Sequence, residues 1–219
     1  MAAANFARTK GIPCLMIGYG MQLGVVEAVR SLLSLPDANS TEVNRLANPA
    51  VVAIPRDRVD ENDGRQNARM GGMDVVLTEG SRTAAIYGLT MVHERHGNRY
   101  EVDDAFLAPL HEVGVDFVGF SADGNYPEVF EIPAHPFYIG TIYHPEFLSR
   151  PNKAHPLFAA FIGAAADNPV AGCSWKLSEI SQNEFVLTEQ AMSYRKILNE
   201  TLAFQSLEIR PVLEIGNPL

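Results

Sequence analysis

Two short stretches of the sequence contain residues whose types and spacing could do chemistry. The first is IPCLMIGYGMQ at 12–22, where a run of apolar residues is followed by closely spaced glycines. This pattern predicts a buried strand, a tight turn and a helix, a shape that usually presents a catalytic nucleophile at its sharpest point. Here the sharpest point is Gly18, which has no side chain and cannot attack a substrate.

The second stretch is YHPEF at 143–147, in which His144 and Glu146 are separated by one residue. We expect both at the end of a strand, where a spacing of two puts their side chains on the same side. An imidazole oriented by a carboxylate can act as a general base on water or on a substrate proton. Taken alone, the same residues would be a surface His-Pro-Glu turn.

No other side chain is an obvious substitute for the nucleophile. Cys14 lies four residues before Gly18, which is about 13 Å along an extended strand. Tyr19 is adjacent, but a phenol with a pKa of about 10 is a poor nucleophile. Cys173 lies far along the chain, where spacing says nothing about its position. Two cysteines are too few for a disulfide framework, so we expect both to be reduced core residues of a cytoplasmic protein.

Composition limits the class of protein. With 219 residues, 47% of them hydrophobic and 20% charged, the chain can form one large ordered domain, or a domain with an appendage. A net charge of −9 without a basic stripe argues against a nucleic-acid partner. No apolar stretch approaches the roughly 20 residues of a membrane span, so we expect no membrane association. We also expect no metal and no cofactor.

The order of predicted elements indicates a mixed α/β fold. Buried strands alternating with helices favour a partly parallel sheet. We expect a long charged loop at 56–72, serving as a binding lid or an exposed hairpin. The predicted helices are 2–10, 21–35, 103–113 and 156–166, and the predicted strands are 12–17, 50–55, 74–80, 99–103 and several short ones within 116–147.

The C-terminal part, residues 167–219, differs from the rest. Breaks at Asn168-Pro169 and Gly172 separate it from what precedes. We predict a helix at 188–204 and a terminal strand within EIRPVLEIGNPL. We interpret this part as an appendage to a domain formed by residues 1–166, packing on that domain or on an oligomer partner.

Three segments together resemble the glutaminase domain of the CTP synthase family and its stand-alone relatives. The resemblance covers residues 3–166 and implies a class I glutamine amidotransferase-like, flavodoxin-like α/β sandwich with a partly parallel sheet. The segments are IPCLMIGYGMQLGVVEAVRSLL at 12–33, then ANSTE at 38–42 with RMGGM and ERHGNRYEVD at 69–73 and 94–103, and HPFYIGTIYHPEFLSRP at 135–151.

This resemblance implies release of ammonia from glutamine by a Cys-His-Glu triad, in which the cysteine attacks and backbone N–H groups hold the oxyanion. His144 and Glu146 match the family's histidine and glutamate. A carboxylate can take the ligand's α-ammonium, and an arginine can pair with its α-carboxylate in bidentate geometry. The positions that match glutamine recognition are Gln22, Glu42, Arg99 and Tyr100, and Tyr19 could add a hydrogen bond.

The chain also departs from the family's pattern. Gly18 stands at the nucleophile position, and Met16 replaces a small residue. Gly97 and Asn98 stand where the family has further basic residues. In the family, several strands and the glycine-rich oxyanion loop precede the segment matching residues 3–11, so we expect an N-terminally truncated sandwich.

Truncation would leave an unpaired sheet edge beside CLMIG at 14–18. The C-terminal appendage, a second subunit or an upstream segment could fill that edge. We predict that the last strand or helix packs there.

Three functions remain open at this point. The chain could be a degenerate amidotransferase that binds glutamine or another small amino-acid-like ligand without hydrolysing it. It could be a repurposed enzyme, with His144 and Glu146 as a general-base pair and Gly18 making room for a bulkier substrate. It could also be an interaction or regulatory subunit, whose oligomeric mass would change on removal of the tail.

Overall fold

The computed structural model describes residues 1–59, 67–150, 152–167, 185–188 and 211–215. The chain divides into two compact units, Met1–Val170 and Ala171–Leu219. In the second unit, β10 (Phe185–Thr188) and β11 (Pro211–Ile215) pair in parallel. The predicted terminal strand is confirmed as β11, whereas Cys173 and nearly all of the predicted helix at 188–204 lie outside the described residues.

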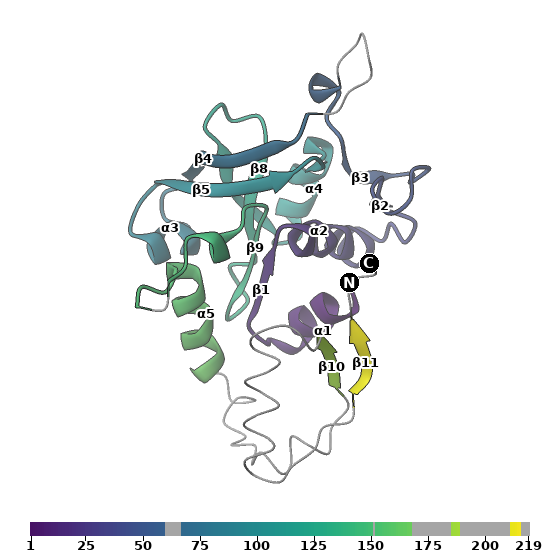
Figure 1. Cartoon of the computed structure of the whole chain (residues 1–219). Helices are drawn as coiled ribbons and strands as arrows, with labels where there is room; N and C mark the ends of the chain where they lie inside the picture. Colours follow the sequence, from purple (N-terminus) through teal and green to yellow (C-terminus); the bar gives the residue numbers. More distant parts are fainter. Residues whose placement is uncertain (60–66, 151, 168–184, 189–210, 216–219) are drawn as a thin grey trace. The chain divides into compact units, whose positions relative to one another are not determined.

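A six-stranded sheet forms the centre of the first unit, in the order β1-β9-β8-β7-β4-β5 (Figure 1). Only the β1–β9 pair is parallel and the other pairs are antiparallel, so the predicted partly parallel sheet is confirmed. Within the described residues β1 pairs with β9 alone, and the packing of the last strand or helix beside β1 stays a prediction. The strands are β1 (Cys14–Ile17), β4 (Arg69–Leu77), β5 (Met91–Asn98), β7 (Asp116–Ser121), β8 (Pro127–Glu131) and β9 (Tyr138–Thr141).

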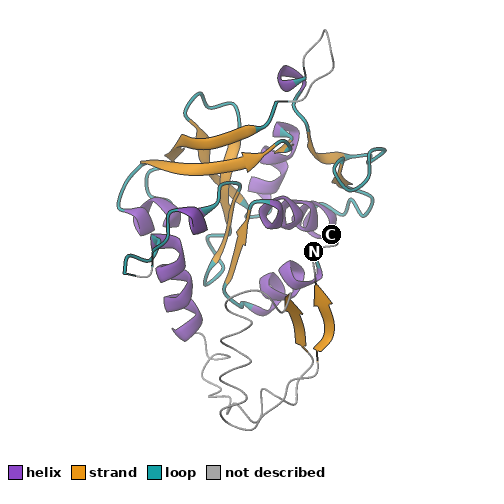
Figure 2. Cartoon of the chain, viewed as in Figure 1, coloured by secondary structure: helices purple, strands orange, loops and turns teal. Residues whose placement is uncertain are grey.

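Helices cover both faces of this sheet (Figure 2). The core on one face contains buried side chains of α1, α2 and α4. The core on the other face contains those of α3 and α5. The helices are α1 (Ala2–Lys10), α2 (Tyr19–Leu32), α3 (Arg82–Tyr87), α4 (Leu107–Glu112) and α5 (Pro156–Asp167). None of the described helices is long and apolar enough to cross a membrane.

A smaller sheet lies beside α2. It contains β2 (Asn39–Ser40), β3 (Ala50–Ala53) and β6 (Glu101–Val102), with β3 in the middle. The buried strand predicted at 50–55 is therefore confirmed as an element, but it belongs to this sheet and not to the central one. The position of this small sheet matters because β2 leads into Glu42 and β6 follows Tyr100.

Several regions differ from the sequence predictions, and α3 is among the elements that were not predicted. The loop predicted at 56–72 contains a short 3-10 helix, η1 (Arg56–Arg58), and β4 already begins at Arg69. The strand β5 was not predicted, because MVHERHGN has a continuous polar run at its centre and no alternation of apolar and polar residues. In the structure every second position is buried, and the buried residues include Glu94, His96 and Asn98.

A buried carboxylate joins α1 to α2. Glu27 is 3% exposed and accepts two hydrogen bonds from Arg8, at 2.7 and 3.1 Å. Asn5 Nδ2 and Ser31 Oγ each donate to the same carboxylate at 2.7 Å. Burial alone would raise the pKa of Glu27, but the hydrogen bonds from Arg8, Asn5 and Ser31 outweigh it and lower that pKa. The charged form of Glu27 therefore stabilises the docking of the first helix.

We predict that Glu27→Gln lowers the free energy of unfolding at neutral pH by about 2 kcal/mol, because charge-assisted hydrogen bonds are lost. Since the folded pKa of Glu27 lies below its unfolded value, its contribution is full above the unfolded pKa and is lost as the pH falls through the folded pKa. In urea unfolding at a series of acidic pH values, the unfolding free energies of the variant and the wild type should converge as the pH falls. The exposed Glu79→Gln is the control, and a pH-independent difference for Glu27→Gln would contradict the assignment.

Candidate functional site

The turn between β1 and α2 is built on Gly18. Its backbone has φ 56° and ψ −119°, a region that glycine adopts without the strain other residues meet. Gly18 N donates to Thr141 O at 2.7 Å, which ties the end of β1 to the end of β9. The predicted strand, tight turn and helix are therefore confirmed, with Gly18 at the sharpest point.

The His144 ring packs against the backbone of Gly18, close to where a side chain would begin. A Cβ added to Gly18 would lie 2.8 Å from Cε1 and 3.0 Å from Nε2 of the imidazole. Separations this short do not occur between well-packed carbon atoms, whose optimal spacing is about 3.5–4.0 Å. Any residue larger than glycine would therefore require the His144 ring to move.

His144 and Glu146 are in contact, although not for the reason expected from the sequence. Neither lies on a strand, because His144 follows β9 and Glu146 belongs to the 3-10 helix η3 (Pro145–Phe147). The tight turn of η3 brings the carboxylate back, so that Nδ1 lies 2.7 Å from Glu146 Oε1. A carboxylate can only accept, so Nδ1 donates, and in the neutral imidazole Nε2, which lies close to Gly18, is then an acceptor.

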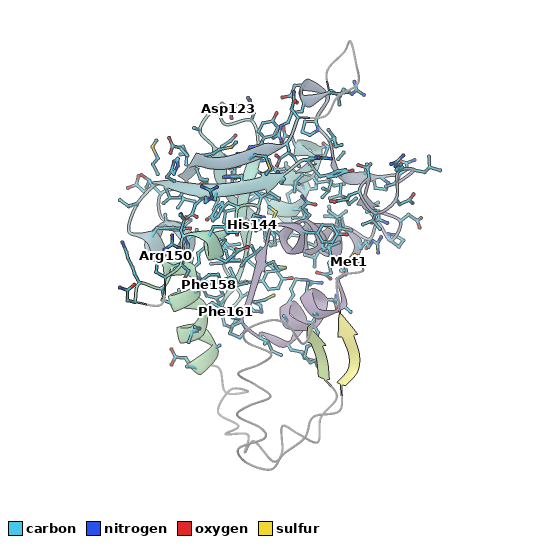
Figure 3. The ribbon with its side chains drawn as sticks, in the orientation of Figure 1. Met1, Asp123, His144, Arg150, Phe158 and Phe161 are labelled. Carbon is cyan, nitrogen blue, oxygen red and sulfur yellow. The ribbon has the colours of Figure 1, made fainter. Side chains whose placement is uncertain are left out.

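The backbone of His144 is held by β5. His144 N donates to Arg95 O at 2.8 Å, and the Phe147 ring lies 5.4 Å from the imidazole, centroid to centroid. Figure 3 labels His144, which lies between the start of α2 and the β4–β5 hairpin. Two separate elements therefore fix the position of this side chain.

A cavity of about 430 Å³ opens beside His144 and gathers most of the residues that the sequence singled out. Glu42 and Arg99 are exposed at the cavity, whereas Gln22 is buried. Glu146 is not a lining residue and reaches the cavity only through its contact with His144. The cavity is lined by Gly18, Tyr19, Gln22, Glu42, Gly97, Asn98, Arg99, Tyr100 and His144.

Comparison with known proteins identifies the family. The sequence model described as glutamine amidotransferase class-I matches residues 1–164. The chain belongs to the class-I glutamine amidotransferase family. Its relatives include the CTP synthases of Beijerinckia indica, 46% identical over 175 residues, and Parvibaculum lavamentivorans, 42% identical over 174 residues. These matches cover 76% and 75% of this chain but only 32% of each relative, so the chain spans about a third of their length.

A solved structure supports the same assignment. The glutaminase domain of Trypanosoma brucei CTPS with bound acivicin matches with a TM-score of 0.72 and 34% identity. The match covers 76% of this chain and 65% of that one. The class I amidotransferase fold and the resemblance to the CTP synthase glutaminase domain are thereby confirmed.

Within this amidotransferase chain, buried charges hold the segment that carries Arg99 and Tyr100. Glu101 Oε1 accepts from Arg58 at 2.5 Å, from Asn98 at 2.7 Å and from Arg69 at 3.5 Å. Burial raises the pKa of Glu101, against the opposing effect of Arg69 and Arg58. Sequence patterns did not reveal this network, since Arg58 and Arg69 lie 43 and 32 residues from Glu101 along the chain.

The network continues among side chains of the central sheet, from β4, β5 and β8. Arg69 also pairs with Glu128, and His96 Nε2 lies 2.5 Å from Glu128 Oε2. These side chains are nearly fully buried. Removing one partner of a buried charge pair is strongly destabilising, so the network keeps the β5–β6 turn in one position.

The structure places Cys14 away from the cavity lining. It lies at the opposite end of β1 from Gly18 and pairs with Tyr138 of β9. Burial raises the pKa of the Cys14 thiol, which makes its thiolate less available. In the described part of the chain, no group of three or more His, Cys, Asp or Glu side chains is arranged to hold a metal ion.

We predict that Gly18→Ala destabilises the fold more than Gly88→Ala does. Both glycines have positive φ, at 56° and 68°, but an added Cβ at Gly88 would meet nothing within 4 Å. The control should lose about 1 kcal/mol from backbone strain alone. Gly18→Ala should lose about 2–4 kcal/mol and shift the imidazole resonances of His144 in NMR spectra. Equal stability of the two variants would contradict the close packing of His144 on Gly18.

Proposed function

We propose that this chain is a CTP synthase-type amidotransferase domain that binds glutamine or a similar small amino acid without hydrolysing it. One observation carries the proposal. The residues at glutamine-recognising positions and His144, which contacts Glu146, line one cavity, while the position for the attacking side chain is Gly18.

The charges at the cavity suit a free amino acid. Glu42 offers a carboxylate to an α-ammonium, and Arg99 offers two parallel N–H donors to an α-carboxylate. Both side chains are exposed before ligand binding, so a ligand meets them without first breaking a buried ion pair. The bound acivicin in the Trypanosoma brucei glutaminase domain supports the view that this fold holds a small molecule.

Glutamine hydrolysis needs a nucleophile that forms an acyl intermediate. Loss of a nucleophile lowers the rate by about 10⁶-fold in a well-studied hydrolase, leaving only the contribution of binding and oxyanion stabilisation. The imidazole lies 2.8 Å from the position of a Cβ at residue 18, so a thiol there would require the ring to move. Binding without turnover follows from these two features.

Calorimetric titration and ammonia release together test this proposal. We predict that L-glutamine binds to the wild type, that ammonia release stays at the level of a buffer blank, and that Arg99→Ala weakens binding about tenfold or more. The exposed Arg45→Ala is a matched control and should bind like the wild type. Wild-type ammonia release above that of His144→Ala would refute the absence of turnover.

Gly18→Cys separates two causes of inactivity. If the variant releases ammonia, the cavity and the His144–Glu146 pair are competent and only the nucleophile is missing. If it stays inactive while glutamine still binds, the crowding of position 18 by His144 prevents a productive thiol. Either result keeps the binding proposal, whereas a failure of both proteins to bind glutamine overturns it.

A second function is favoured by the state of the His144 ring. Glu146 holds Nδ1, and Nε2 lies between Gly18 and Gly97, whose added Cβ would be 4.0 Å away. An imidazole in this state can activate a water molecule directly, without a covalent intermediate. We propose hydrolysis of a substrate more labile than an amide as the alternative activity.

Hydrolysis of L-glutamate γ-methyl ester tests the alternative. If His144 is a general base, the wild type should release methanol faster than His144→Ala by about 10²-fold or more. Cys14→Ser, a change at a residue outside the cavity lining, should match the wild type. Equal rates for the wild type and His144→Ala would exclude the general-base role.

A further inference from the structure

Every second residue of β5 faces solvent, and this exposed face of the strand leads into the cavity. Its exposed positions include His93, Arg95 and Gly97, whereas the residues between them are buried. Gly97 lines the cavity, and a Cβ added to it would lie 4.0 Å from His144 Nε2. The face of β5 that carries Arg95 is therefore the face on which the imidazole lies.

The side chain of Arg95 begins close enough to reach the cavity. Two residues along a strand advance the backbone by about 6.6 Å and place their side chains on the same face. The guanidinium of Arg95 can therefore extend over the bare backbone of Gly97. The backbone at Arg95 is itself tied to the site, because His144 N donates to Arg95 O at 2.8 Å.

No neighbouring carboxylate neutralises the charge of Arg95. The residue opposite it on β4 is Gly72, which has no side chain. Asp74, further along β4, instead lies with its carboxylate 2.7 Å from His93 Nδ1. Within the part of the chain that the structure describes, the exposed side chain of Arg95 forms no ion pair and no hydrogen bond. Its guanidinium is thus available to an anion from outside.

Arg99 is a second arginine of this kind, and it lies on the other side of Gly97 along the chain. It lines the cavity and is exposed, and it has no ion pair with any described residue. One arginine is enough for the α-carboxylate of an amino acid. The other can bind a further anion, since a planar guanidinium recognises carboxylates in bidentate geometry. A ligand that uses both arginines carries two acidic groups.

Building on the ligand binding proposed above, we infer that Arg95 is a specificity-determining residue that selects ligands with a second acidic group. The ligand class is a glutamine whose amide nitrogen carries an acidic substituent, as in a γ-glutamyl amino acid. The α-carboxylate of such a ligand pairs with Arg99, its amide lies beside His144, and its distal carboxylate pairs with Arg95. A side chain at position 97 would stand between the two arginines, and glycine leaves this path open.

Calorimetric titration of three probes tests the inference. The probes are L-glutamine, γ-L-glutamylglycine and L-glutamine γ-ethylamide, which has a methyl group in place of the distal carboxylate of γ-glutamylglycine. The wild type should bind γ-glutamylglycine about tenfold more tightly than the ethylamide, because a charge-assisted pair with Arg95 is added. Arg95→Ala should abolish this preference and leave the affinities for the ethylamide and for glutamine unchanged.

Two further variants control for position and for charge. Arg45→Ala removes an exposed arginine outside the cavity lining and should keep the full preference for γ-glutamylglycine. Arg95→Lys keeps the positive charge but not the planar fork, so it should keep part of that preference.

The outcomes separate this inference from the proposed function. A wild type that binds glutamine without preferring γ-glutamylglycine to the ethylamide would refute the role of Arg95 and leave the binding proposal in place. Retention of the preference in Arg95→Ala would do the same. A wild type that binds none of the three probes would overturn the proposed function as well.

A spectroscopic measurement on the wild type requires no substitution. The side-chain Nε–H resonance of Arg95 should shift on saturation with γ-glutamylglycine and stay in place with the ethylamide. Equal shifts with both probes, or none with either, would overturn the contact between Arg95 and the distal carboxylate.

Discussion

The contact between His144 and the bare backbone of Gly18 is the constraint on which the rest of the site depends. The two residues meet because β1 and β9 run in parallel, and Gly18 N bonds to Thr141 O just before His144. A parallel pair brings the ends of both strands to the same edge of the sheet. The imidazole can then approach only because position 18 has no Cβ, so the sheet and the glycine together define where the cavity begins.

The opposite wall of the cavity depends on charges that lie outside it. Arg99 and Tyr100 sit in a turn between two strands that belong to different sheets, and a turn of this kind would normally be mobile. The buried carboxylate of Glu101, paired with Arg58 and Arg69, holds this turn in place. Buried ion pairs are weak as sources of stability but strong as geometric constraints, since breaking one leaves an uncompensated charge. Here they fix the direction in which the recognition residues face.

A feature of the fold or site can be predicted from the sequence when the residues that cause it are neighbours along the chain. The turn at Gly18 follows from adjacent residues, so the strand, turn and helix were predictable. The burial of Glu94 and His96 was not predictable, because their partners His155 and Glu128 lie 61 and 32 residues away along the chain. The His144–Glu146 contact was predicted on strand geometry that is absent, and a 3-10 turn makes it instead. The recognition residues were located only through family resemblance.

At the family's nucleophile position, this chain has a glycine packed closely against the histidine. The imidazole lies 2.8 Å from the position that the first side-chain carbon would take, and Glu146 holds its Nδ1. Opposite it, Gln22 and Asn98 keep buried amides oriented by one carbonyl, and Glu42 and Arg99 keep opposite charges at the cavity. The residues at the family's recognition positions thus line one cavity, while the family's nucleophile position is a glycine packed against His144. This arrangement supports the proposed function, in which a ligand is held at the cavity beside His144.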